Sequence, residues 1–454
     1  MAARGIALLL VCSTSAAGGA AVRRCASAPR ALARAAAFAV GSAGPARTAG
    51  AAEYTAVLLV PTGIGAAIGG YAGDALPVAR ALAAVVDVLV THPNVLNGAM
   101  LYWPPPNALY VEGWALDEFA AGRLGLRRVR RNRLGLVLDA AIEPELRARH
   151  VQAADAARAT LGLDIAGWAL TDGPVGVELA TSARTGASWG TVRRPDALVR
   201  AARALVDEHG CTALALVCRL PDSEPDSAGS LAYRAGDGVD AVGGVEALLS
   251  RLVARTLRLP CAHAPALAPL PLDAAVSPRA AAEELGHTFL PCVLANLHRA
   301  PALCSPDARA PLDATCGTSA DEFVLTRADG GARGADALTL WARDVDAVIV
   351  PASACGGSAL LSLAARPHVL IVAVEENACV MAATPEALGL GGGQAVRGGG
   401  ARGVGGARGA HVVRAATYLE AVGIVAAHRA GLNLEALTVR GVGALPKLTS
   451  RRHV

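Results

Sequence analysis

Short apolar runs recur along this chain and alternate with stretches that have the pattern of amphipathic helices. A run of four to eight buried residues suits a strand that is covered on both faces, and a helix between two such strands makes them parallel. The sequence therefore predicts an α/β fold, with a mainly parallel sheet and helices on both faces. The runs that carry this prediction are 54–60, 86–93, 133–142, 165–174, 211–221, 345–350 and 368–377.

Residues 1–52 have the composition of a targeting leader. They contain six arginines and no acidic residue, and they are rich in alanine and serine. An apolar core at 5–12 resembles a secretory signal, and the arginine-rich segment after it resembles a transit peptide. The two in series predict the stroma of a plastid reached through a bipartite leader. A single plastid or mitochondrial transit peptide is the alternative.

The rest of the chain is predicted to be one α/β domain, 53–440, followed by a polar tail, 441–454. Two stretches interrupt the pattern: 301–340 is polar and irregular, and 389–410 is a Gly/Arg tract that cannot bury a core. We interpret both as insertions. The chain has no apolar run of the roughly 20 residues that a membrane helix needs, so we expect a soluble protein without a membrane partner.

The distribution of charge argues against nucleic acid as a partner. Without the leader's six arginines, 36 basic residues remain against 38 acidic ones, a formal net charge of −2 instead of +4. Lys447 is the single lysine, and it lies in the polar tail. Chemistry that needs a placed lysine, such as a pyridoxal phosphate Schiff base, is therefore not expected.

Glycine-rich turns follow two of the apolar runs. In parallel sheets, ligands bind at the carboxyl ends of the strands, and backbone N–H groups in such turns can hold an anion. We therefore predict a small anionic metabolite, a phosphate or a carboxylate, as the ligand. The alternative is that the glycines only permit tight turns and close packing. The predicted binding residues are Thr62, Gly63, Gly65, Ser353, Gly356, Gly357 and Ser358.

Polar residues at the ends of several runs supply candidates for catalysis. His92, Asp172, Cys355 and Glu375 are the predicted acids, bases or nucleophiles. Cys355 precedes a predicted helix, and a thiol in that position is expected to have a lowered pKa and high reactivity. Because both glycine turns follow parallel strands, we expect them to open on the same edge of the sheet and to line one pocket.

A second cluster suggests a metal site instead. Cys261 and His263 are two residues apart, and Glu284 and His287 lie three apart on one predicted helix. These side chains could ligate zinc or iron. Their spacing matches no standard zinc pattern. Buried and solvated structural roles are the alternative.

The segments "ASACGGSALLSL" and "PCAHAPALAPL" faintly resemble the two cysteine segments of glutamate and aspartate racemases, in the opposite order. A more extensive resemblance is to an uncharacterised cyanobacterial and plastid family, domain of unknown function 3326. It covers about Tyr54 to Leu437 and is carried by strings such as "VPTGIGAAIGGYAGDALPVARALA", "LYVEGWALDEFAAG" and "DAVIVPASACGGSALLSLA". This resemblance implies a plastid location and one contiguous domain, and it assigns no reaction.

Three functions follow as hypotheses. The preferred one is an enzyme that acts on a small anionic metabolite, with cysteine acid–base chemistry of the racemase type as a lesser possibility. The second is a metal-dependent site on the Cys261 cluster. The third is a plastid binding or assembly protein without turnover.

Overall fold

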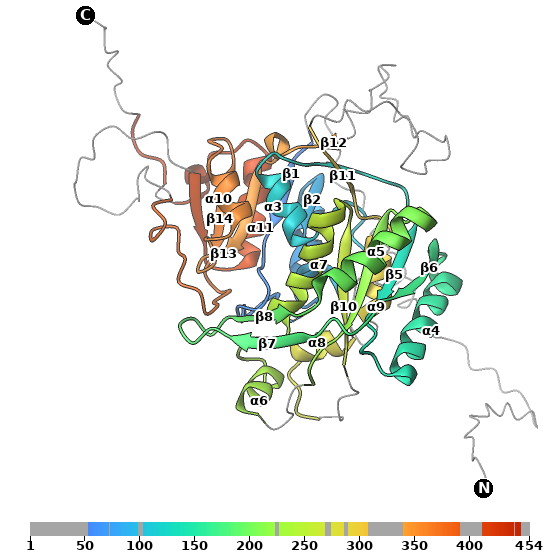
Figure 1. Ribbon diagram of the computed structural model, residues 1–454. Coiled ribbons are helices and arrows are strands. Elements are labelled where there is room, and N and C mark those ends of the chain that lie inside the picture. Colours follow the sequence, from blue (N-terminus) through green and yellow to red (C-terminus); the bar gives the residue numbers. More distant parts are fainter. Residues whose placement is uncertain are drawn as a thin grey trace, which may run out of the picture. The chain divides into compact units, whose positions relative to one another are not determined.

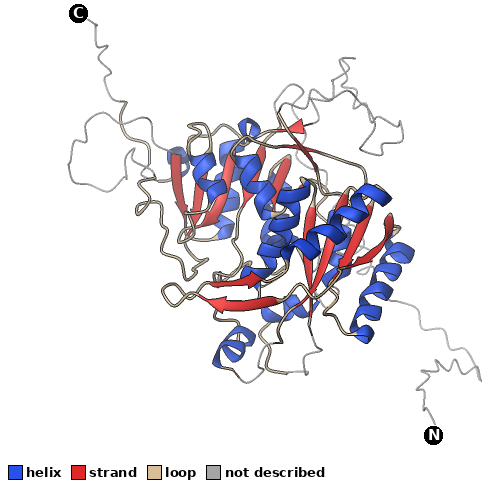
Figure 2. Ribbon diagram, in the orientation of Figure 1, coloured by secondary structure: helices blue, strands red, loops and turns tan. Residues whose placement is uncertain are grey.

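Two parallel sheets organise the chain in the computed structural model (Figures 1 and 2). The structure describes residues 53–71, 73–98, 103–222, 227–267, 274–285, 289–306, 339–390, 411–439 and 441–445. All of them belong to one compact unit, Arg47–Val454. The α/β class with mainly parallel pairing is confirmed. The predicted strands are divided between two sheets instead of forming one.

The larger sheet has six strands, and all of its pairs are parallel. Its central strands are buried at every position because helices cover both faces, which explains their continuous apolar sequences. Segments far apart in the sequence meet here, since β1 pairs with β13 (Figure 1). In spatial order the strands are β15 (His411–Ala415), β14 (Leu370–Val374), β13 (Ala347–Pro351), β1 (Thr55–Leu58), β2 (Val88–Thr91) and β3 (Ala108–Tyr110).

The second parallel sheet has four strands. Helices α5 and α7 pack on its strands, as do α4 and α9. In spatial order the strands are β10 (Cys261–Ala266), β9 (Ala213–Arg219), β5 (Leu134–Leu138) and β6 (Ile165–Leu170). Two small antiparallel groups accompany the parallel sheets: β11 (Ala302–Cys304), β4 (Gly125–Arg127) and β12 (Thr339–Leu340), and the pair β7 (Val177–Thr181) and β8 (Ser188–Val192).

The helices connect these strands. They are α1 (Leu76–Val85), α2 (Pro93–Leu96), α3 (Gly113–Ala120), α4 (Pro144–Leu161), α5 (Pro195–His209), α6 (Ala228–Arg234), α7 (Gly243–Leu257), α8 (Ala280–Leu285), α9 (Phe289–Leu297), α10 (Ser358–Ala364) and α11 (Tyr418–Arg429), with 3-10 turns η4 (Ala342–Asp344) and η5 (Leu434–Leu437). Helix α7 packs both on β10 and on α3, so it joins the two parallel sheets. Nowhere in the described residues is a helix both long and apolar enough to cross a membrane.

The stretch 301–340 is less irregular than predicted. Its two described ends are the strands β11 and β12, and both pair with β4 in antiparallel fashion. Residues 307–338 between them lie outside the described residues, as do the leader and most of the Gly/Arg tract. The predictions made for those segments remain predictions.

The chain reverses its direction of travel through the larger sheet between β1 and β13. From β1 it proceeds to β2 and β3 on one side, and from β13 it proceeds to β14 and β15 on the other. Loops that follow the two central strands diverge at such a switch point and leave a crevice at the carboxyl edge. The topology therefore indicates where a ligand would bind.

Candidate active site

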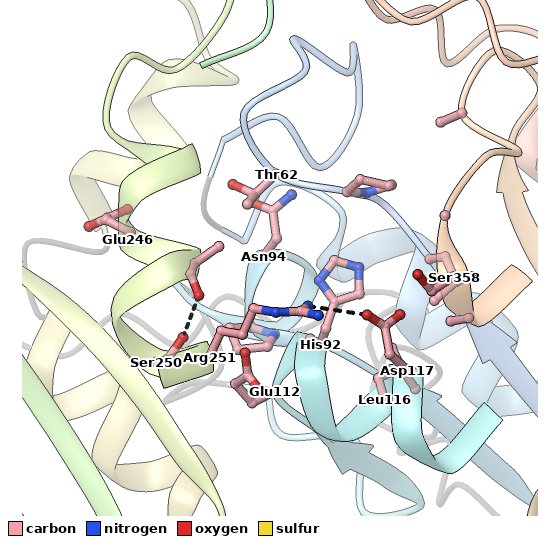
Figure 3. A pocket seen from close by; sticks show the side chains of 18 of the residues that line it. Thr62, His92, Asn94, Glu112, Leu116, Asp117, Glu246, Ser250, Arg251 and Ser358 are labelled. Atoms are coloured by element: carbon pink, nitrogen blue, oxygen red, sulfur yellow. Dashed lines mark hydrogen bonds and ion pairs between the residues drawn. The ribbon is translucent and has the colours of Figure 1, made fainter. Parts of the chain in front are cut away.

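A cavity of about 290 Å³ lies at this switch point, between the carboxyl edge of the larger sheet and helix α7 (Figure 3). Its size is at the lower end of the range for small-molecule sites. The residues that line it are Leu59, Pro61, Thr62, His92, Pro93, Asn94, Asn97, Glu112, Gly113, Leu116, Asp117, Asp240, Glu246, Ala247, Ser250, Arg251, His263, Glu283, Val350, Ala354, Gly357, Ser358, Ala359 and Leu360.

His92 follows β2 directly and contributes a ring whose tautomer is fixed. Its Nε2 atom lies 2.8 Å from the backbone nitrogen of Val60. Because a backbone N–H can only donate, Nε2 must accept, and the ring proton is assigned to Nδ1. Burial lowers the pKa of His92 to about 4, so the ring is neutral at physiological pH. His92 therefore offers the cavity a neutral N–H donor.

Glu112 follows β3 and is the N-cap of α3. Its Oε2 atom accepts hydrogen bonds from the backbone N–H groups of Trp114 and Ala115, at 2.8 and 3.3 Å. Burial raises the pKa of Glu112 to about 7, against the opposing effect of these hydrogen bonds and of Arg251. Among the described residues, nothing hydrogen-bonds to Oε1. A buried carboxyl group that titrates near neutral pH can serve as both acid and base.

Arg251 on α7 reaches across to Asp117 on α3, with 3.2 Å between Nη1 and Oδ2 (Figure 3). Its side chain is 47% exposed, which leaves its remaining N–H donors open to solvent or ligand. It is the one arginine or lysine among the described lining residues. Arg251 is therefore the residue best placed to bind an anionic group of a ligand.

A second group of titratable side chains lines the cavity beside α7. Nδ1 of His263 lies 3.0 Å from the hydroxyl of Ser250, and its Nε2 lies 3.8 Å from Oε2 of Glu246. Burial raises the pKa of Glu246 well above its usual range, and the negative charges of Asp240 and Glu283 add to this effect. Burial also raises the pKa of Asp240 to about 6 and lowers that of His263 to about 4.

The structure brings together only some of the residues predicted as a site. Thr62, His92, Gly357 and Ser358 line the cavity, and His263 from the proposed metal cluster joins them. The two turns do open on the same edge of one sheet, as expected, since β1 and β13 are neighbouring parallel strands. The remaining predicted residues do not line the cavity; they are Gly63, Gly65, Ser353, Gly356, Asp172, Cys355, Glu375 and Cys261.

Gly63 and Gly65 are required for packing. Both have positive φ, +70° and +64°, which side chains rarely adopt. A Cβ at Gly65 would lie 2.6 Å from the carbonyl oxygen of Gly238, and one at Gly63 would lie 2.5 Å from Oγ of Ser188. The first glycine turn therefore allows the segment after β1 to approach the hairpin β7–β8 and the loop before α7.

Asp172 and Glu375 are surface groups paired with arginines. Oxygens of Asp172 lie 2.7 and 3.3 Å from nitrogens of Arg200 and Arg194, and the hydrogen bond from Arg200 lowers the pKa of Asp172. Glu375 lies 3.0 Å from Arg414. Arg194 and Arg200 belong to the start of α5 and Arg414 to β15, so these pairs depend on how the elements pack and not on a local sequence signal.

Cys355 differs most from its prediction. Its side chain is completely buried, and burial raises the pKa of the thiol to about 11. The expectation of a lowered pKa is therefore wrong, because desolvation outweighs any benefit from the following helix. Burial also raises the pKa of Cys261 well above its usual range. The faint resemblance to cysteine racemases thus finds no support in the placement of the two thiols.

The predicted metal cluster is only partly visible. His287 and the side chain of Glu284 lie outside the described residues. Within the described residues, no group of three or more His, Cys, Asp or Glu side chains could hold a metal ion.

Sequence reasoning missed Glu112, Arg251 and Glu246. The strand before Glu112 has only three residues, too short to register as an apolar run, although Glu112 directly precedes a helical pattern as an N-cap would. The two α7 residues are charged residues of a helix, which are usually solvated. Only the packing of α7 onto α3 makes them part of a cavity wall.

The fold and site define an α/β protein with a cavity at the switch point of a parallel sheet. Comparison with known proteins identifies the family: the model of the family "Protein of unknown function (DUF3326)" matches residues 55–438, and the chain belongs to this family. An "Uncharacterized lipoprotein" of Synechococcus sp. (strain ATCC 27144) is 50% identical over 386 residues, covering 85% of this chain and 94% of that protein. No solved structure matches this chain.

Proposed function

We propose that this protein is an enzyme that performs acid–base chemistry on a small metabolite carrying a carboxylate or phosphate group. The observation that carries the proposal is the pairing of Glu112 with His92 in one cavity. One is a buried carboxyl group with a pKa of about 7, and the other is a neutral imidazole of fixed tautomer. Perturbed titratable groups in a cavity are typical of catalytic sites.

The geometry suggests a role for each residue. Arg251 would bind the anionic group, and Ser358 and Thr62 add hydroxyl groups to the lining of the same cavity. Glu112 would remove a proton from the carbon next to a carbonyl group. The Nδ1–H of His92 would donate a hydrogen bond to the carbonyl oxygen as negative charge develops on it. A neutral imidazole suits this role, since it can stabilise the oxyanion without protonating it beforehand.

Proton exchange with solvent tests this proposal on a whole class of compounds at once. The protein is incubated in D₂O with a collection of small carboxylates and phosphates, and mass spectrometry detects incorporated deuterium. We expect one compound class to gain deuterium at a carbon, and Glu112→Gln to slow the exchange by at least a hundredfold.

The matched control is Glu118→Gln on the same helix. Glu118 pairs with Arg123 and does not line the cavity, so this variant should exchange at the wild-type rate. If a compound binds in a thermal-shift assay and no compound exchanges deuterium, the proposal of an enzyme is contradicted. That result would favour a binding protein without turnover.

We further propose a plastid location, supported by the composition of residues 1–52 and by the cyanobacterial relative. A fluorescent protein fused to residues 1–60 should enter plastids. Retention in the cytosol would contradict this location.

A further inference from the structure

The cavity is lined by many more acidic side chains than basic ones. Among the described residues, five carboxyl groups line it, those of Glu112, Asp117, Asp240, Glu246 and Glu283, against the one guanidinium of Arg251. The guanidinium is already paired with Asp117. A ligand that carried only an anionic group would leave most of these carboxyl groups without a partner, which points to a further feature of the ligand.

Glu246 shows where that feature would bind. Its carboxyl group makes no hydrogen bond with any described residue, and its Oε1 atom is enclosed and unpartnered. The nearest ring nitrogen is Nε2 of His263, 3.8 Å from Oε2 and beyond hydrogen-bonding distance. Buried carboxyl groups without a donor are rare in native proteins, because leaving them unpaired is costly.

The neighbours of Glu246 supply few donors. The hydroxyl of Ser250 lies 3.4 Å from the carbonyl oxygen of Ala247 and 3.0 Å from Nδ1 of His263, and it has one proton for these two contacts. Neither of these side chains hydrogen-bonds to Glu246 in the described part of the chain. Asp240 is an acceptor too, and its Oδ1 is engaged by the backbone N–H of Val242 at 3.0 Å. The described side chains of this wall therefore leave Oε1 of Glu246 without a donor.

We propose that the ligand carries a primary ammonium group, bound at the wall formed by Asp240, Glu246 and His263. An ammonium group has three N–H donors for the carboxyl oxygens of this wall, and its positive charge would favour the ionised form of the buried Glu246. Together with an anionic group at Arg251, the ligand class is an amino acid or a similar zwitterion of small size. This inference rests on the proposed function and specifies its substrate.

Matched pairs of compounds test the ammonium group directly. The probes are alanine with lactate, aspartate with malate, and phenylalanine with phenyllactate, since each pair differs by an amino against a hydroxyl group. Binding is measured by thermal shift and calorimetry. We expect the amino member of at least one pair to bind at least tenfold more tightly than its hydroxyl partner.

Glu246→Gln assigns the site. This substitution keeps the shape and removes the carboxyl group that would ionise beside an ammonium group. The preference for the amino compound should therefore fall at least tenfold, while binding of its hydroxyl partner is unaffected. Glu145→Gln on the exposed start of α4 is the control and should preserve the preference. Circular dichroism confirms that both variants fold.

Three results would overturn the inference. Both members of every pair could bind equally, or the preference for the amino compound could survive Glu246→Gln. A thermal shift caused by MgCl₂ or ZnCl₂ alone, with no shift from any amine, is the third. Its failure is separable from that of the proposed function. Deuterium exchange in hydroxy acids only would support the proposed enzyme and contradict the ammonium site. Tight binding of an amine without exchange in any compound would support the ammonium site and contradict the enzyme.

Discussion

The two glycine turns follow neighbouring strands of one sheet, yet the structure uses them in opposite ways. In the turn after β1, Gly63 and Gly65 adopt positive φ and lie against backbone and side-chain atoms of other segments. In the turn after β13, Gly357 has an ordinary extended conformation, φ −71° and ψ 148°, and an added Cβ would meet nothing within 4 Å. One turn joins parts of the fold, and the other leaves room beside a cavity.

The difference shows that a glycine-rich turn at a strand end is not by itself a ligand site. Such turns arise wherever the backbone needs positive φ or close approach, and an open cavity is only one of the reasons. What distinguishes the second turn is the surrounding space, and that depends on α7, a helix more than 100 positions earlier in the chain.

Gly65→Ala should have the largest effect on stability. A side chain at φ +64° costs about 1–2 kcal/mol, and contact with the carbonyl oxygen of Gly238, which cannot move aside, adds about 1–3 kcal/mol. We expect the free energy of unfolding to fall by about 4 kcal/mol, measured by urea denaturation. The control is Gly162→Ala, which has φ +66° and open space around it, and should lose only the conformational part. Equal losses in both variants would show that close approach does not matter at Gly65.

Glu112→Gln tests the environment of the cavity through the pH dependence of the free energy of unfolding. The pKa of Glu112 is raised from 4.5 to about 7, so the folded state binds a proton that the unfolded state releases. The cost of burying this group is absent below about pH 4.5, grows as the pH rises, and levels off above about pH 7. It reaches about 3 kcal/mol. Glu112→Gln should therefore stabilise the protein at pH 8 and have little effect at pH 4, and a gain independent of pH would contradict the raised pKa.

Cys355 offers a chemical test of the turn after β13. Because its thiol is buried and has a pKa of about 11, we expect iodoacetamide at pH 8 to label the partly exposed Cys379 at least tenfold faster. Peptide mapping after short labelling times measures both rates. Faster labelling of Cys355 would show that this turn opens in solution and would revive its role as a nucleophile.

The sequence predicts the parts of the fold that depend on local pattern. Continuous apolar runs in the sequence mark the buried strands β1, β2, β5, β9, β13 and β14. Long stretches of helix-forming residues, without glycine and with proline only at the first position, mark α4 and α5. β10, with the sequence "CAHAPA", and β15, which begins directly after the Gly/Arg tract, carry no such signal. Tertiary pairing makes them strands.

The site was harder to predict for the same reason. His92 and Ser358 follow strong strands and could be placed at the sheet edge from sequence. Glu246 and Arg251 come from a helix whose sequence does not indicate which neighbour it meets. The burial that lowers the pKa of His92 and raises that of Cys355 is likewise a property of packing.

Gly357→Ala should have the smallest effect on folding and the clearest effect on binding. Alanine adopts the backbone conformation of Gly357 without strain, and its methyl group meets no atom within 4 Å, so the free energy of unfolding should change by less than about 0.5 kcal/mol. The methyl group would, however, project beside a cavity of only about 290 Å³, so calorimetry should show weaker binding of whichever zwitterion binds the wild type. Gly423→Ala, on α11 and away from the cavity lining, is the control and should bind like the wild type. If Gly357→Ala lowers stability as strongly as Gly65→Ala, or leaves binding unchanged, then the second turn is as structural as the first and the contrast between them fails.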